Sequence, residues 1–244
     1  MNLNLQKIKQ IIQDSQNIVF FGGAGTSTES GIPDFRSATG LFNTKAGGSY
    51  TPEEVLSHDF FMNEPNEFYR FYFKHMIYPE AKPNKAHVAL AELEQMGKLR
   101  AVITQNIDGL HQLAGSRNVL ELHGSVMRNY CMECRAYFEL NDILSINEGE
   151  IPQCNKCSGL IKPDVVLYQE ALNHDVMQRA KRAIADAEVL IVAGTSLKVY
   201  PAAGLIQFYS GDRMILVNKS TTPQDRLANF VIQDSIGEVL ESIT

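Results

Sequence analysis

Small residues follow an apolar run near the N-terminus of the chain. Residues 18–21 are apolar, and Gly22, Gly23, Ala24 and Gly25 come directly after them. This change is typical of a buried strand that ends in a tight loop, where backbone N–H groups can approach a ligand closely. A helix that begins beyond the loop adds a partial positive charge at its N-terminus, which favours a pyrophosphate. The pattern therefore predicts a dinucleotide site.

The residues beyond this loop make the prediction more specific, because a glycine turn alone can serve only backbone geometry. Pro33 is followed by Phe35 and Arg36, an aromatic ring and a guanidinium that can close over a ligand. The third glycine of the dehydrogenase fingerprint is missing, with Thr28 in its place. No acidic residue ends a second strand about 20 residues later. An ordinary hydride-transfer site is therefore disfavoured.

The four cysteines form two close pairs, Cys131 with Cys134 and Cys154 with Cys157, and 19 residues separate the pairs. Two Cys-x2-Cys pairs at this separation are typical of a four-thiolate zinc site. Four thiolates leave no open position for water, so we expect one structural zinc ion in each chain. The metal would fold a segment that is too short and too polar to make a core of its own.

Polar residues follow the strand expected at residues 99–103. Gln105 and Asn106 carry amides that can bind ribose hydroxyls or a carboxamide, and Asp108 can hold a carboxamide NH2 or face a developing positive charge. The alternative for Asp108 is an Asx turn that caps the following helix. The end of this strand is therefore a candidate part of the site.

His123 follows another expected strand, at residues 119–122. A base with a pKa near neutrality could there take a proton from a ribose hydroxyl, although a lone histidine is more often structural. Two later strands end in Thr195-Ser196 and Asn218, which offer further hydroxyl and amide groups to one extended ligand.

Composition excludes several classes of protein. The 244 residues are 44% hydrophobic and 20% charged, as in an ordinary globular protein, and the net charge of −6 gives no electrostatic case for nucleic-acid binding. The N-terminus is typical of an amphipathic helix rather than a signal peptide, and no apolar run is long enough to span a bilayer. We expect a cytoplasmic protein that does not bind membranes.

Strand and helix patterns alternate over much of the chain. Strands are expected at 17–21, 99–103, 119–122, 164–168, 188–193, 213–217 and 229–232, and helices at about 3–15, 84–96, 173–186 and 201–209. Residues 40–84 differ, since their many aromatic residues predict the core of a small helical lobe. The fold class is therefore α/β, with a mostly parallel sheet whose ligand lies beyond the carboxyl ends of its strands.

Taken in order, these motifs resemble the sirtuin (Sir2-like) family of NAD-dependent protein lysine deacylases, bacterial deacetylase type. The residues that carry the resemblance are 23–27, 31–37, 104–108 with Leu110 and His111, 123–124, the four cysteines, 162–166, 194–197 and 217–218. The resemblance implies a Rossmann-like large domain at 1–39, 85–125 and 162–244, and a small domain made of a helical module at 40–84 and a zinc module at 126–161.

The resemblance also implies roles for individual residues. Contacts to NAD are expected from Ala24, Thr28, Arg36, Gln105, Thr195, Ser196, Asn218 and Ile236, a nicotinamide pocket from Phe35, Ile107 and Asp108, and catalysis from His123 and Asn106. His123 would remove a proton from a ribose hydroxyl, and the products would be nicotinamide, O-acetyl-ADP-ribose and free lysine. The acetylated protein substrate is expected to pair between residues 166–170 and 197–200, at Val166, Tyr168, Glu170 and Val199.

The chain departs from the family pattern at two places. Gln169 stands where many relatives have glycine, which puts the geometry of the substrate peptide in question. An aromatic residue, Tyr72, stands where the desuccinylase branch has an arginine, although Arg70 lies close by, and this favours neutral acyl groups. The alternatives are mono-ADP-ribosyl transfer to a protein side chain and an NAD-sensing module with little turnover. A monomer is favoured.

Overall fold

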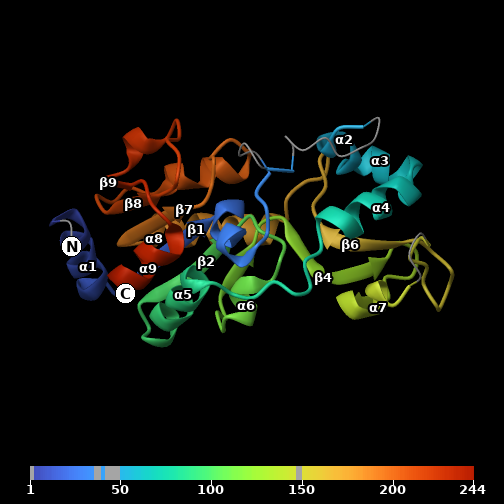
Figure 1. Cartoon of the computed structure of the whole chain (residues 1–244), viewed down its shortest axis with the longest axis horizontal. Coiled ribbons are helices and arrows are strands. Elements are labelled where there is room, and N and C mark those ends of the chain that lie inside the picture. Colours follow the sequence, from blue (N-terminus) through green and yellow to red (C-terminus); the bar gives the residue numbers. More distant parts are fainter. Residues whose placement is uncertain (1–2, 36–39, 42–49, 147–149) are drawn as a thin grey trace.

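The computed structural model describes residues 3–35, 40–41, 50–146 and 150–244, and in this part of the chain a six-stranded parallel sheet lies beside a smaller region of helices and antiparallel strands (Figure 1). The strand order in the parallel sheet is β3-β2-β1-β7-β8-β9. Its strands are β1 (Ile18–Gly22), β2 (Leu99–Thr104), β3 (Val119–Glu121), β7 (Val189–Ala193), β8 (Met214–Val217) and β9 (Phe230–Ile232). All six lie within one residue of the predicted bounds.

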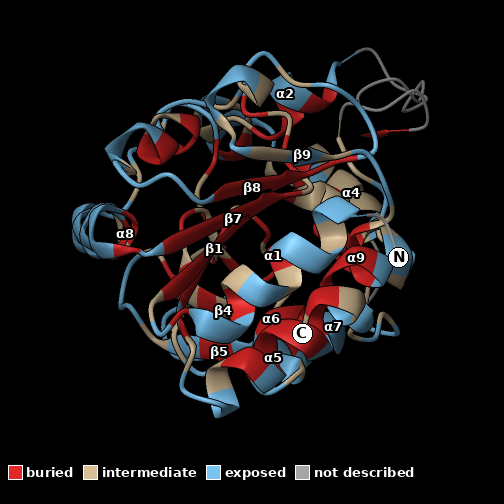
Figure 2. Cartoon of the chain, turned by 90° about the vertical axis from the view of Figure 1, so that its left-hand side faces the viewer, coloured by how far each residue is buried: buried red, intermediate tan, exposed pale blue. Residues whose placement is uncertain are grey.

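Strands β1, β7 and β8 are buried (Figure 2). Apolar side chains on both faces of the sheet explain this burial. Phe20 of β1 packs against one cluster of helical residues, and its neighbour Phe21 packs against the other cluster, on the opposite face. The first face is covered by α1 (Leu3–Asp14), α5 (Lys85–Gln95) and α9 (Ile236–Ile243), and the second by α8 (His174–Asp186) and the 3-10 helix η3 (Ala202–Phe208). Continuous apolar strands under two helical layers are typical of parallel sheets.

The aromatic segment forms three short helices, α2 (Pro52–Val55), α3 (His58–Asn63) and α4 (Pro65–His75). We call residues 50–76 the helical segment. Phe61, Phe68, Tyr69 and Tyr72 are fully or almost fully buried and pack on one another, which confirms that the aromatic residues form a core. Residues of the antiparallel sheet, such as Val126, complete this cluster.

The antiparallel sheet has the order β5-β4-β6. It consists of β4 (Gly124–Cys131), β5 (Tyr137–Glu139) and β6 (Ile161–Val165), with α7 (Leu140–Leu144) beside it. We call the described part of residues 124–165 the four-cysteine lobe. The prediction of a strand at 164–168 in the alternating series was wrong, because the strand begins at Ile161 and pairs with β4. Its alternating burial is that of a half-exposed antiparallel strand.

Three other features differ from expectation. The helix expected beyond the glycine loop is a 3-10 helix, η1 (Ala24–Ser30), which begins within the loop, and the helix expected at 201–209 is the 3-10 helix η3. Helix α9 was not predicted. The remaining short elements are α6 (Leu110–Leu113) and η4 (Asp225–Leu227). No helix in the described part of the chain is long and apolar enough to cross a membrane.

Candidate functional site

A cleft of about 1130 Å³ opens at the carboxyl ends of the parallel strands and extends to the helical segment. It is lined by all the residues predicted to contact NAD or substrate that the structure describes: Ala24, Thr28, Phe35, Gln105, Asn106, Ile107, Asp108, His123, Val166, Tyr168, Glu170, Thr195, Ser196, Val199, Asn218 and Ile236. Arg36 lies outside the described residues. Residues from distant parts of the sequence therefore share one cavity.

Strand register explains why these residues meet. Gly22 pairs with Thr104 on one side and with Ala193 on the other, and Ala193 pairs with Val217. The four strands β2, β1, β7 and β8 thus end at the same level, and the residue after each end points into the same region. Parallel sheets place their ligand sites at this edge.

The glycine loop packs directly on the loop after β7. The N–H of Gly25 donates to the carbonyl of Gly194 at 2.8 Å, and a Cβ on Gly25 would lie 2.7 Å from the Cα of Gly194. The N–H of Gly23 donates to Ala193, and that of Thr26 donates to Gly23. These amides are already engaged, so a phosphate must bind to neighbouring groups rather than to all the amides of the loop.

A hydrogen-bond network joins the glycine loop to the end of β2. The Ser27 hydroxyl donates to Asp108 Oδ2 at 2.7 Å and accepts a hydrogen bond from Asn106 Nδ2 at 3.0 Å. Asp108 also accepts from the N–H of Leu110 at 2.9 Å, so the Asx turn considered from the sequence is present together with the network, although the N-cap residue of α6 is Gly109. Sequence reasoning assigned no role to Ser27. Its place in the glycine-rich motif was the only signal.

His123 is oriented by a backbone carbonyl. Its Nδ1 lies 2.9 Å from the carbonyl oxygen of Gln105, which can only accept, so Nδ1 carries the proton. In the neutral ring Nε2 then holds the free lone pair. Burial lowers the pKa of His123 below its ordinary value, although the bond to Gln105 opposes this effect. The imidazole is therefore neutral near pH 7 and able to accept a proton at Nε2.

Thr195 and Asn218 brace the other half of the cleft. The Asn218 side chain accepts from the N–H of Thr195 and donates to its carbonyl, both at 3.1 Å. Gln105 Nε2 donates to Thr195 Oγ1 at 3.0 Å. The ends of β2, β7 and β8 are therefore fixed to one another by side chains as well as by the sheet.

The predicted substrate edge adjoins His123. The N–H of Val166 donates to the carbonyl of His123 at 3.0 Å. Glu170 accepts from the N–H of Leu167 at 2.9 Å and from Lys162 Nζ at 3.1 Å, and these bonds close a tight turn. Burial tends to raise the pKa of Glu170, but these partners outweigh burial and hold the pKa below its ordinary value. The turn after β6 is therefore fixed both to the backbone of His123 and to the four-cysteine lobe.

The four cysteine sulfurs form a compact cluster, and every pair of Sγ atoms lies within 4.8 Å. Cys131 and Cys157 are 3.5 Å apart, and Cys134 and Cys154 are 3.6 Å apart. Sulfurs at about 2.3 Å from a tetrahedral zinc ion would be about 3.8 Å apart, so the arrangement fits this metal. Backbone N–H groups of Cys134 and Lys156 point at the sulfurs of Cys131 and Cys154, as expected for thiolates.

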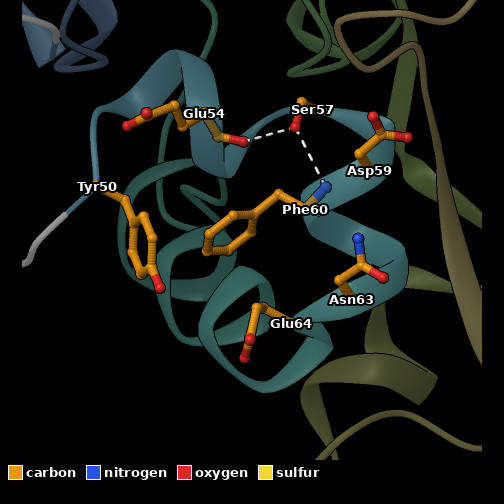
Figure 3. Close-up of a pocket in the computed structure, with 7 residues that line it drawn as sticks. All are labelled: Tyr50, Glu54, Ser57, Asp59, Phe60, Asn63 and Glu64. Carbon is orange, nitrogen blue, oxygen red and sulfur yellow. Dashed lines mark hydrogen bonds between the residues drawn. The ribbon is translucent and has the colours of Figure 1, made fainter.

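A second hollow, of about 300 Å³, lies on the helical segment (Figure 3). It is lined by Tyr50, Glu54, Ser57, Asp59, Phe60, Asn63 and Glu64. None of these residues was predicted from the sequence to belong to the site.

Comparison with known proteins gives a consistent result. A model of the Sir2 family matches residues 23–201. An "NAD-dependent protein deacetylase" of Clostridium tetani is 59% identical over 98% of this chain and 96% of its own length. A Sir2 histidine-to-alanine variant solved with a deacetylated p53 peptide and 3′-O-acetyl ADP-ribose has a TM-score of 0.90 and 38% identity, covering 99% of this chain and 97% of that chain. A Sir2–p53 peptide–NAD+ structure has a TM-score of 0.87 and 39% identity, with the same coverage.

Proposed function

Because this chain belongs to the Sir2 family, we infer that it is an NAD-dependent protein lysine deacetylase. The products of the reaction are nicotinamide, O-acetyl-ADP-ribose and the free lysine. The observation that carries this function is the neutral imidazole of His123, fixed at the end of β3 in the same cleft as the glycine loop. Protein substrates agree with the relatives that were solved with peptides.

The donor set of the cleft fits NAD. Small residues of the glycine loop, the hydroxyls of Thr28, Thr195 and Ser196 and the amide of Asn218 line the half expected to take the phosphates and the adenosine. When bound, NAD supplies the ribose carbon to which the acetyl oxygen attaches as nicotinamide leaves. Ile236, buried at the start of α9, closes this half of the cleft.

His123 is the base in this proposal. Its Nε2 takes the proton of a ribose hydroxyl, and the protonated ring is stabilised by the carbonyl of Gln105, which accepts from Nδ1. Removal of this proton by His123 would make the hydroxyl oxygen a nucleophile toward the acetyl carbon. The lowered pKa of His123 keeps the base form populated near pH 7.

The network of Ser27, Asn106 and Asp108 forms the nicotinamide end of the cleft in this proposal. Asn106 is held by Ser27 beside the ribose, and Asp108 is aligned to accept from the carboxamide NH2. Phe35 and Ile107 supply apolar cover that keeps water away from the reacting carbon.

The acyl group is expected to be neutral. Arg70 pairs with Glu67 at 2.9 Å on the exposed side of α4, and it is not among the described residues that line the cleft. Tyr72 is buried in the aromatic core. Neither side chain is therefore placed to bind an acidic acyl chain.

The four cysteines hold a structural zinc ion in this proposal. All four sulfurs are within reach of one ion, which leaves no open position for a water or a substrate. The ion therefore stabilises the four-cysteine lobe and takes no part in the reaction.

The test is incubation of the protein with NAD and an acetyl-lysine peptide, followed by mass spectrometry. We expect nicotinamide, the deacetylated peptide and O-acetyl-ADP-ribose in equal amounts. ADP-ribose attached to a protein would favour the transferase alternative, whereas NAD binding without any product would favour a sensing module. A succinyl-lysine peptide, used in parallel, tests the preference for a neutral acyl group and should react much more slowly.

A further inference from the structure

Gln169 has an unusual backbone conformation at the predicted substrate edge. Its φ is +76°, in the left-handed region that side chains with a Cβ rarely adopt, and its side chain is exposed. Glycine would adopt this conformation at a lower free-energy cost. Contacts made by the Gln169 side chain can offset this cost.

Those contacts are made with one residue of the helical segment, Asp59. The N–H of Asp59 donates to Gln169 Oε1 at 3.0 Å, and Gln169 Nε2 donates to Asp59 Oδ2 at 2.9 Å. The amide therefore uses its acceptor on the backbone of Asp59 and its donor on the carboxylate. Such a two-point contact defines orientation as well as distance.

Asp59 is itself held firmly in the first turn of α3. The Ser57 hydroxyl donates to the carbonyl of Glu54 at 2.7 Å and accepts from the N–H of Phe60 at 3.2 Å (Figure 3). These bonds cap α3 and fix the turn between α2 and α3. A partner attached to Asp59 is therefore attached to a rigid part of the helical segment.

The backbone beside Gln169 runs between this segment and the catalytic base. The N–H of Tyr168 donates to the carbonyl of Leu56 at 2.9 Å, and the carbonyl of Tyr168 accepts from the N–H of His58 at 3.0 Å. At the other end, Val166 donates to the carbonyl of His123. The clamp at Gln169 thus adds a side-chain contact to the two backbone bonds of Tyr168, at the end of residues 166–168 that lies away from His123.

We propose that Gln169 is a positioning residue for the acetyl-lysine peptide, because its clamp on Asp59 reinforces the backbone bonds that hold residues 166–168, part of the segment with which the peptide is expected to pair. This proposal rests on the deacetylase function given above. The contact is on the surface and outside the apolar clusters, so its loss should change peptide affinity much more than stability.

Steady-state kinetics with an acetyl-lysine peptide test the proposal, using two variants of Gln169. Gln169→Gly relieves the unfavourable φ and removes the clamp. Gln169→Glu keeps the acceptor for the Asp59 N–H but sets a carboxylate against Asp59 Oδ2. We expect each to raise the peptide KM about three- to tenfold, which corresponds to the loss of one or two exposed hydrogen bonds, with kcat and the KM for NAD within about twofold of wild type.

A polarity swap provides the specific control. In Gln169→Glu with Asp59→Asn, the new amide can donate to the new carboxylate, so the peptide KM should return toward the wild-type value. Asp59→Asn alone should change little, because its carbonyl can still accept from Gln169. Asn63→Ala on the same helix, which has no bond to residues 166–170, should also behave as wild type.

Binding of a fluorescent acetyl-lysine peptide without NAD gives a second, activity-independent measurement. A wild-type protein that binds this peptide but forms no product would contradict the proposed function, while the ratio of dissociation constants would still test Gln169. Unchanged peptide affinity in both Gln169 variants would overturn the positioning role. So would an equal loss in kcat and in both KM values, or a failure of the polarity swap to restore affinity.

Discussion

The floor of the cleft and the four-cysteine lobe are held in place by different forces. The floor consists of the ends of β1, β2, β7 and β8 with the loops that follow them, and two large apolar clusters bury the strands behind it. Among the described residues of the four-cysteine lobe, the cluster beneath the sulfurs contains only Cys131, Phe138, Ile143, Cys154 and Ile161 as buried members. The sheet therefore positions reactive groups by burial, whereas the lobe depends on a metal for its structure.

Removal of zinc should have the largest effect of any change considered, and it should act on the lobe. Structural zinc sites contribute about 10 to 16 kcal/mol of apparent binding free energy, which the lobe's small core cannot replace. We expect Cys131→Ala to lose its zinc and to expose the lobe to proteolysis. Metal content and limited proteolysis measure this, with Asn155→Ala as the control. One zinc per chain in Cys131→Ala would contradict the four-ligand site.

For the floor of the cleft we expect the opposite result, a large loss of activity with little loss of stability. His123→Ala should lower kcat about 10²- to 10⁴-fold, the usual contribution of a positioned general base, while the melting temperature and NAD affinity change little. His174→Ala, on the exposed surface of α8, is the matched control. Appreciable deacetylation by His123→Ala would remove this residue from the mechanism.

Gly124 lies between His123 of the cleft floor and the rest of the four-cysteine lobe. Its substitution should therefore affect both activity and stability. Its φ is +74°, and an added Cβ would lie 1.8 Å from the carbonyl oxygen of Asp164. Gly124→Ala must therefore separate β4 from β6 and move the adjacent His123. We expect a loss of at least about 2 kcal/mol in the free energy of unfolding, together with reduced kcat. Denaturant unfolding and kinetics measure the two effects. A variant as stable and active as wild type would show that the junction tolerates movement.

A smaller effect is expected for two buried histidines behind the floor, which should make the stability of the protein depend on pH. Burial lowers the pKa of His111 to about 3 and that of His87 to about 4, below the unfolded value of about 6.5. The folded state therefore keeps both rings neutral, and stability falls as the pH drops below about 6.5. Each of the two histidines should lower the free energy of unfolding by about 2 kcal/mol when the pH falls from 7 to 5. The free energy of unfolding measured in urea should depend less steeply on pH in His111→Phe than in the wild type. An identical dependence would contradict the role given to His111.

The elements of the parallel sheet were predictable because each apolar strand is short and is followed by polar or small residues. Parallel strands end at one edge, so Gln105, His123 and Asn218 could be expected to meet without knowledge of their contacts. The strand β6 was misplaced because its alternating pattern was not separated from the buried runs on either side. Helix α9 has apolar residues at helical spacing, Ile236, Val239, Leu240 and Ile243, and this signal was present but not used.

Contacts between distant polar side chains could not be predicted in the same way. Ser27 and Asp108 are separated by 81 positions, and Asp59 and Gln169 by 110. Nothing in the local pattern of either pair indicates a partner, because their distance depends on how whole elements pack. The geometry of the site was therefore predictable where the sheet determines it. Where side chains determine it, the sequence alone was not sufficient.

The central position of β1 has a consequence for synthesis of the protein. One neighbour of β1 is β2, but the other is β7, so that Ile18 pairs with Val189. While the ribosome is still translating the middle of the chain, one edge of β1 has no strand to pair with, and the face that α8 and η3 cover in the folded protein has no helix over it. The floor of the cleft, which includes the ends of β7 and β8, can therefore form only near the end of translation.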